Sequence, residues 1–153
     1  MNIRLPLLCV MVCVLTTAGC TTPASDEVAA AAAVPLTGTT WRLTQIGDQL
    51  VDNPPGDAAA HIQLQAGNSR VTGFAGCNRM FGGYSLNGES LKFDQVGATK
   101  MACVEEGRMQ LESDFFETLS KVARWKITNS TLELLDGGGK SLATFAAAPA
   151  AAQ

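Results

Sequence analysis

Charged side chains are scarce in this chain of 153 residues: they make up 16% of it, below the usual level, and leave a net charge of −3. A nucleic-acid-binding domain needs clustered Lys and Arg to neutralise phosphates, whereas the 11 basic residues here are scattered. The longest apolar run is too short to cross a hydrocarbon layer of ~30 Å as a helix. We therefore expect no nucleic-acid partner and no ordinary membrane-spanning helix.

Residues that support catalysis or metal binding are equally few. His61 is the one histidine, so a thiol nucleophile has a single candidate base, and two cysteines with one histidine do not make a zinc pattern. Glu105 and Glu106 are adjacent and would point apart on a helix. Gly137, Gly138 and Gly139 lack the lysine and the following helix of a phosphate loop. We expect no enzymatic activity, no cofactor and no metal.

The N-terminal residues show the pattern of an export signal. Arg4 supplies the positive start, and an almost entirely apolar run follows from Leu5 to Leu15, the length typical of a signal peptide. The run ends in Ala18-Gly19-Cys20, which resembles the end of a bacterial lipobox. This resemblance implies a signal peptide over residues 1–19 and diacylglycerol on Cys20. Cleavage after Ala18, which would release a soluble protein, and retention of the segment as an anchor are the alternatives.

Low-complexity segments flank the remaining chain. Residues 20–35 begin at Cys20 and continue with an Ala- and Pro-containing stretch that we interpret as a flexible tether, and residues 147–153 are predicted to be a disordered tail. The residue after the cysteine, Thr21, is not Asp, which resembles lipoproteins sorted to the outer membrane. We expect a domain over residues 36–146, held in the bacterial cell envelope and facing the periplasm.

Period-two alternation of apolar and polar residues dominates residues 36–146 and predicts β-strands with one wet face. Turn-forming residues such as Gly67-Asn68-Ser69 and Asn87-Gly88 separate neighbouring strands into hairpins. Between Glu105 and Val122 the period changes, and Leu111, Phe115, Leu119 and Val122 form the stripe of a helix that packs on a core. The predicted fold class is α+β, mainly β. It is a curled antiparallel sheet or partly open β-barrel of about seven or eight strands, with one helix packed on it.

Cysteine parity predicts a disulfide. Cys9 and Cys13 leave with the signal peptide, and acylation of Cys20 would leave Cys77 and Cys103, which an exported compartment favours pairing. Two free buried thiols, or a redox or metal role, are the alternatives. Their separation of 26 positions corresponds to about 3.5 kcal/mol in the loop-closure model.

Several motifs in this order resemble the META domain (HslJ-like) family. The sharpest are Gly76-Cys77-Asn78 and Thr99-Lys100-Met101-Ala102-Cys103, and they lie between an opening Gly38-x-x-Trp41-x-Leu43 and a closing Leu132-x-Leu134 and Phe145. The resemblance implies a compact β-rich domain with one helix and a link to envelope stress or antibiotic tolerance. It implies no established reaction. We take Gly76, Cys77, Asn78, Thr99, Met101 and Cys103 as a structural motif, in which Asn78 bonds its own backbone in a tight turn.

The functional prediction is a non-catalytic, monomeric envelope lipoprotein that binds an unknown protein or lipid-like ligand, and touches the membrane through the lipid on Cys20. A thiol-dependent enzyme and a periplasmic inhibitor or adaptor that pairs through a β-edge are the alternatives. An apolar pocket for the ligand has five aromatic candidates: Trp41, Phe74, Phe81, Tyr84 and Trp125.

Overall fold

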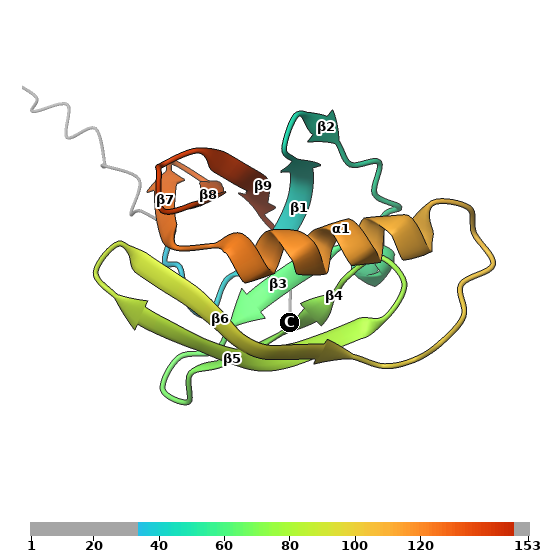
Figure 1. Ribbon diagram of the computed structural model, residues 1–153, viewed down its shortest axis with the longest axis horizontal. Coiled ribbons are helices and arrows are strands. Elements are labelled where there is room, and N and C mark those ends of the chain that lie inside the picture. The colour runs from blue at the N-terminus through green and yellow to red at the C-terminus, as the bar shows by residue number, and fades with distance from the viewer. Residues whose placement is uncertain (1–33, 149–153) are drawn as a thin grey trace, which may run out of the picture. The chain divides into compact units, whose positions relative to one another are not determined.

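The computed structural model describes residues 34–148, which form a strongly curled antiparallel sheet with one α-helix (Figure 1). The predicted signal peptide and the predicted acylation of Cys20 lie outside the described residues. In chain order the elements are β1 (Thr40–Ile46), β2 (Gln49–Leu50), a short 3-10 helix η1 (Gly56–Ala58), β3 (His61–Leu64), β4 (Arg70–Phe74), β5 (Arg79–Asn87), β6 (Ser90–Ala98), α1 (Arg108–Lys121), β7 (Arg124–Thr128), β8 (Thr131–Leu135) and β9 (Ser141–Ala147).

The sheet closes on itself. Its strand order is β2-β1-β3-β4-β5-β6-β7-β8-β9, and β1 also pairs with β9, so β1 links the two halves of the sheet into a ring. At this junction Leu43 is the register partner of Phe145, while Trp41 is the partner of both Ile62 and Ala147. The short strand β2 extends the end of β1 through Leu50, the partner of Gln45.

Within the described residues, the weakest pairing of the ring is between β6 and β7, and the helix packs beside it against β6, β1 and β9. β6 and β7 share a single register pair, Ser90 with Arg124, and separate beyond it. α1 connects these two strands in sequence and lies across the curled sheet near β6 (Figure 1). The helix therefore covers the interior of the barrel next to the place where β6 and β7 separate.

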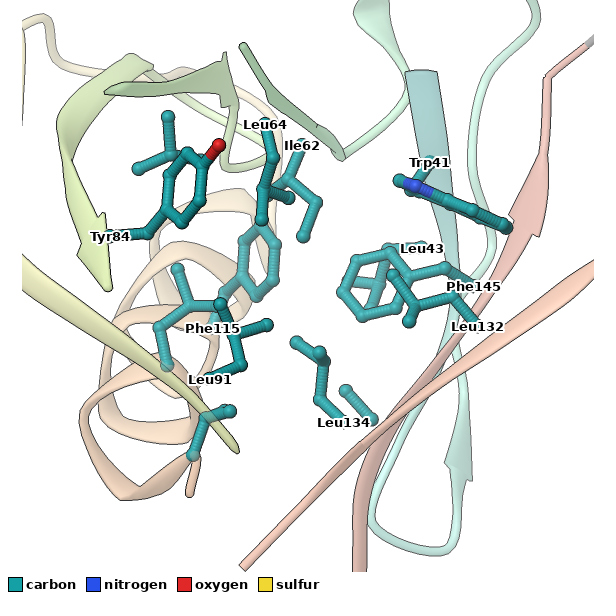
Figure 2. Close-up of a cluster of buried hydrophobic side chains, with 14 of the residues drawn as sticks. Trp41, Leu43, Ile62, Leu64, Tyr84, Leu91, Phe115, Leu132, Leu134 and Phe145 are labelled. Carbon is teal, nitrogen blue, oxygen red and sulfur yellow. The ribbon is translucent and has the colours of Figure 1, made fainter. Parts of the chain in front are cut away.

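One hydrophobic core lies inside the ring and continues under the helix (Figure 2). Phe115 of α1 points into it and meets Phe145 of β9 with a ring-centroid distance of 6.0 Å. Each fully buried aliphatic or aromatic side chain stabilises the fold by about 1.5–3 kcal/mol relative to exposure. The largest fully buried side chains include Trp41, Leu43, Ile62, Leu64, Met80, Leu91, Leu119, Leu132 and Leu134.

The predicted fold class is confirmed, and the differences are local. The strands number nine in the described residues because β2 is only two residues long and has no periodic pattern. The helix begins at Arg108, three residues after the predicted Glu105, because Gly107 at its N-cap adopts a left-handed φ of 79°. β9 extends into the predicted tail, since Ala147 pairs with Trp41 and the N–H of Ala148 donates to the carbonyl of Thr40.

Candidate functional site: the braced end of the helix

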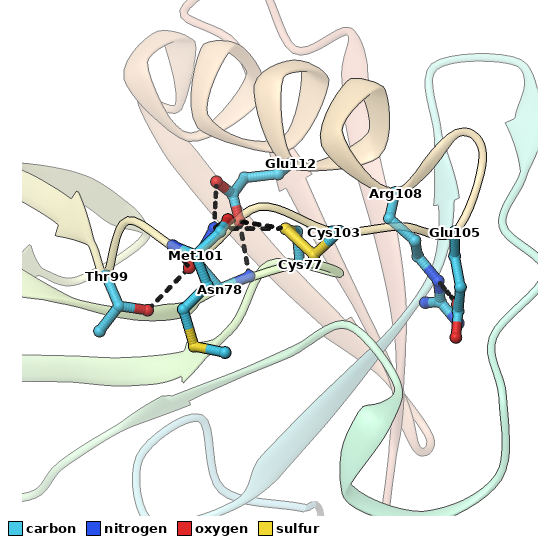
Figure 3. Close-up of a disulfide and its surroundings, with 8 residues drawn as sticks. All are labelled: Cys77, Asn78, Thr99, Met101, Cys103, Glu105, Arg108 and Glu112. Carbon is cyan, nitrogen blue, oxygen red and sulfur yellow. Dashed lines mark hydrogen bonds and ion pairs between the residues drawn. A yellow bond between two sulfur atoms is a disulfide. The ribbon is translucent and has the colours of Figure 1, made fainter.

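A disulfide joins two loops at the N-terminal end of α1 (Figure 3). Cys77 lies in the 75–78 turn between β4 and β5, and Cys103 lies in the 99–107 loop between β6 and α1. Their Cα atoms are 5.8 Å apart, within the usual range for this bond. The disulfide therefore holds the chain that leads into the helix against the turn that follows β4.

Asn78 is a buried hydrogen-bonding centre beside the disulfide, and its residue is only 4% exposed. Its Oδ1 accepts from the hydroxyl of Thr99 at 2.9 Å and from the backbone N–H of Met101 at 2.8 Å. Its Nδ2 donates to the carbonyl of Met101 at 3.2 Å. The prediction that Asn78 bonds its own backbone in a turn is wrong: the side chain binds the loop more than 20 positions later, because that loop passes directly over it.

Glu112 of α1 completes this network from the helix side. Its Oε2 accepts from the backbone N–H of Asn78 at 2.7 Å, and its Oε1 accepts from the Nδ2 of Asn78 at 3.1 Å (Figure 3). The Glu112 residue is half-buried, so its carboxylate is only partly exposed to solvent. Hydrogen bonds to a charged acceptor are stronger than neutral ones, so this pair ties the second turn of α1 to the 75–78 turn.

Gly76 allows the helix to approach the turn closely. Its φ is +103°, which a residue with a side chain rarely adopts, and a Cβ built there would lie 2.8 Å from Cδ2 of Leu111. Leu111 therefore packs directly on the backbone of the 75–78 turn. Glycine at this position explains why the turn and the helix touch without an intervening side chain.

A second loop is pinned near the same end of the helix. Asn53 in the 51–55 loop donates from Nδ2 to the carbonyl of Leu43 in β1, and its Oδ1 accepts from the N–H of Ala60 at 2.8 Å. One side chain thus holds the loop to β1 and to the residue that precedes β3. The loops on both sides of the helix start are braced by side-chain hydrogen bonds.

Two open hollows flank the first turn of α1, and Arg108 lines both. The disulfide hollow, of about 290 Å³, is lined among others by Pro54, Phe74, Cys77, Cys103, Val104 and Arg108. The acidic hollow, of about 440 Å³, lies toward β2. Its lining combines apolar and acidic side chains, chiefly Ile46, Leu50, Val51, Asp52, Glu106, Leu111 and Asp114.

Arg108 separates the two hollows and is largely buried. Its Nε donates to Oε2 of Glu105 at 2.8 Å, and its side chain is 16% exposed. Its Nη1 is buried without a hydrogen-bond partner among the described residues. Pairing with Glu105 places the charge of Arg108 against a carboxylate of the loop that leads into the helix.

Large apolar side chains around this end of the helix are exposed to solvent. Leu50 of β2 is 83% exposed, Met109 in the first helical turn is 60% exposed, and Val104 in the 99–107 loop is fully exposed. Met101 in the same loop is 69% exposed. Exposed apolar groups gathered near hollows are typical of interaction surfaces.

The structure gathers the predicted motif at one place. Asn78 contacts Thr99 and Met101, while Gly76 underlies Leu111 and the two cysteines are joined.

The five aromatic candidates are instead divided among different places in the described part of the chain. Trp41 is fully buried and Tyr84 is 8% exposed, both in the core, while Phe81 is 48% exposed at the surface. Phe74 lines the disulfide hollow, and the half-buried Trp125 donates its indole N–H to the carbonyl of Gly88. We therefore place the candidate site at the hollows and not at an aromatic pocket.

His61 occupies a structural position, since its Nδ1 lies 2.8 Å from the carbonyl oxygen of Ala59. Within residues 34–148, no three His, Cys, Asp or Glu side chains come together as a metal-binding group. In the same part of the chain, no helix combines the length and the apolar character needed to cross a membrane.

Glu112 and Leu50 are among the contributors to this end of the molecule that the sequence patterns do not indicate. Glu112 carries a faint signal, because it directly follows Leu111 and therefore lies at the border of the apolar stripe. Leu50 carries none, because a two-residue strand has no period.

A ring-closed antiparallel sheet with a helix beside its weakest strand pairing and a disulfide at the helix start defines the class of domain. A sequence model of the META domain family matches residues 34–149, most of the chain, and the protein belongs to this family. No curated protein matches the sequence.

Solved structures share the fold. A protein from Burkholderia xenovorans, solved by NMR, is 28% identical with a TM-score of 0.58, and the match covers 75% of this chain and 85% of that one. A second NMR structure is 20% identical with a TM-score of 0.59, covering 73% and 91%. A crystal structure of a DUF4847 family protein from Bacteroides vulgatus is 16% identical with a TM-score of 0.52, covering 72% and 93%.

Proposed function

We propose that this protein is a lipid-anchored, non-catalytic binding module of the bacterial cell envelope. The observation that carries the proposal is the disulfide between Cys77 and Cys103. Structural disulfides form and persist in oxidising compartments such as the periplasm and are rare in the cytosol. This bond agrees with an N-terminal segment that has the composition of a signal peptide and ends at Cys20.

The chemistry of the described residues favours binding over catalysis. Both cysteine sulfurs within residues 34–148 are used in the disulfide, so neither is the thiolate that nucleophilic attack requires. The exposed apolar side chains of Leu50, Val104 and Met109 lie near two hollows, an arrangement suited to contact with a partner.

Strand addition is less favoured than side-chain contact as the mode of binding. The pairing of β1 with β9 joins the two halves of the sheet, and α1 lies near the part of β6 that β7 leaves unpaired. Membership of the META family adds the expectation of a role in envelope stress or antibiotic tolerance. Attachment through Cys20, on the outer membrane and facing the periplasm, would hold the domain close to the membrane on its tether.

Intact mass of the membrane-extracted protein, measured without reductant, tests this proposal. We expect a chain that begins at Cys20, carries acyl groups, and is lighter by two hydrogens than a chain with both thiols free. The Cys20→Ala variant should lose the acyl mass and keep the disulfide. A reduced, unprocessed chain in the cytosol would refute the proposal, and a processed chain without acyl groups would replace lipid anchoring with secretion.

A further inference from the structure

The acidic hollow carries an unbalanced negative charge next to apolar side chains. Asp52, Glu106 and Asp114 line it, and within residues 34–148 none of these three forms an ion pair. The one basic residue in the lining, Arg108, is paired with Glu105. Three carboxylates thus remain without a cationic partner in the part of the chain that the structure describes.

The positive end of the helix does not reverse this balance. A helix N-terminus is equivalent to about half a positive charge, which is smaller than the charge of the three carboxylates. An anionic ligand would meet net repulsion in the acidic hollow, whereas a cationic one would be attracted and oriented.

The apolar contribution comes from side chains on both sides of the hollow. Leu50 and Val51 follow β1 on one side, and Leu111 of α1 lies on the other. Leu50 is 83% exposed, and the fully exposed Val104 lines the adjoining disulfide hollow. The surface is therefore larger than one small cation needs, and it suits an extended ligand with apolar and basic groups.

The hollow is shaped before any ligand arrives. Asn53 pins the loop that follows β2, and the hydrogen bonds between Asn78 and Glu112 pin the helix on the other side. Binding to such a surface avoids the entropy cost of ordering loops, which improves affinity.

We propose that the acidic hollow docks a cationic amphipathic peptide segment of a partner protein. Its Lys or Arg side chains lie against Asp52, Glu106 and Asp114, and its apolar residues lie against Leu50 and Val104. This inference rests on the proposed binding function and names the chemistry of the partner.

Fluorescence anisotropy with a labelled synthetic amphipathic helix of Lys and Leu tests the docking site. The full mature protein is held in neutral maltoside micelles at low salt, and protein-free micelles provide the blank. We expect saturable binding that weakens about tenfold or more when Asp52→Asn, Glu106→Gln and Asp114→Asn are combined. The control combines Glu89→Gln, Asp94→Asn and Glu133→Gln, which remove the same charge outside the hollow, and should bind as the parent does.

A second pair of variants tests the apolar contact. Leu50→Ser should weaken binding about fivefold, as expected for loss of one leucine that the bound peptide partly covers. Leu86→Ser removes another exposed leucine, 42% exposed in β5, and should change nothing. Each variant must have the intact mass of a chain with the disulfide formed, and it must unfold in a cooperative thermal transition. These two controls separate loss of binding from loss of folding.

Three results would each overturn the inference. The first is that both charge-matched triple variants bind the peptide equally weakly, and the second is that a probe in which Glu replaces Lys binds as tightly as the original. The third is saturable binding of spermine in the absence of the peptide. The last result would define a site for small amines. None of these depends on acylation of Cys20, so failure here and failure of the proposed envelope anchoring are told apart by the intact mass.

Discussion

The two ends of α1 are both anchored by buried apolar side chains, yet their polar attachments differ. At the N-terminal end a disulfide and the buried Asn78 hold the preceding loop and the helix. At the C-terminal end Lys121 pairs with Glu117 at 2.6 Å and Arg124 pairs with Glu89 at 2.7 Å, and all four side chains are at least half exposed. Exposed ion pairs contribute at most about 1 kcal/mol, so the strong polar attachments are concentrated at the N-terminal end.

This difference coincides with the position of the exposed apolar residues. Val104 and Met109 flank the start of the helix, where the bracing is strongest. Exposed apolar side chains add nothing to folding by burial, so a rigid support beneath them is consistent with presentation to a partner. The variants below test whether the two ends differ as the contacts indicate.

Removal of the disulfide should have the largest effect. The double variant Cys77→Ala and Cys103→Ala is expected to lose about 3.5 kcal/mol of unfolding free energy, because the unfolded chain is no longer cross-linked over 26 positions. Urea unfolding measures the change, with reduced parent protein as the comparison. A loss below about 1 kcal/mol would show that the bond does little for stability.

Replacement of Asn78 should come next. Asn78→Ala is expected to cost about 3 kcal/mol, because it removes a buried side chain that bonds both the backbone N–H and the carbonyl of Met101, and those two groups lose their partner in a partly buried position. Asn78→Asp keeps the shape and replaces the Nδ2 donor with an oxygen that faces the carboxylate of Glu112. Denaturant unfolding of both variants separates the contribution of side-chain shape to the unfolding free energy from that of the hydrogen bonds. An Asn78→Asp variant as stable as the parent at neutral pH would contradict the donor role assigned to Nδ2.

A smaller loss is expected for Glu112. Glu112→Gln retains one acceptor oxygen and loses one charge-assisted bond to Asn78, which corresponds to about 1.5 kcal/mol. Glu117→Gln is the matched control on the exposed side of the same helix. The melting temperature of the Glu112 variant should be clearly lower than that of the Glu117 variant. Equal melting temperatures would contradict the bracing of the N-terminal end of α1.

The smallest effect should be a dependence of the unfolding free energy on pH, caused by the ion pair at the C-terminal end of α1. The hydrogen bond from Lys121 lowers the pKa of Glu117 below its ordinary value of 4.5. A carboxyl with a lowered folded-state pKa stabilises the protein above the unfolded-state pKa, and this contribution is lost as pH falls below 4.5 through the folded-state value. The unfolding free energies of the parent and of Lys121→Met should differ slightly at pH 6 and become equal toward pH 3. Denaturant unfolding at several pH values between these two measures the difference.

The fold was largely predictable because its signals are local. Alternation in strands such as β8 and turn residues such as Asn87-Gly88 describe hairpins from neighbouring residues alone. The stripe ending in Leu119 and Val122 likewise describes a helix that packs on a core. These patterns predict one helix on a curled sheet without any knowledge of distant contacts.

The candidate site was predictable only in part because its contacts are distant in sequence. The motif residues Asn78 and Met101 were identified, whereas the bond between Asn78 and Glu112 spans 34 positions and leaves no local pattern. The acidic hollow joins Leu50 and Asp114 from segments far apart in the chain. Closure of the barrel brings these segments together, and no single segment encodes the result.

Hydrogen–deuterium exchange on the variant lacking both domain cysteines tests the central comparison most directly. We predict faster exchange in residues 99–112, including the N–H of Leu111 that donates to Gly107 at 2.9 Å, while residues 119–128 keep the protection of the parent. Equal loosening of both ends, or unchanged exchange at both, would contradict the conclusion that the N-terminal end of α1 is the specifically braced one.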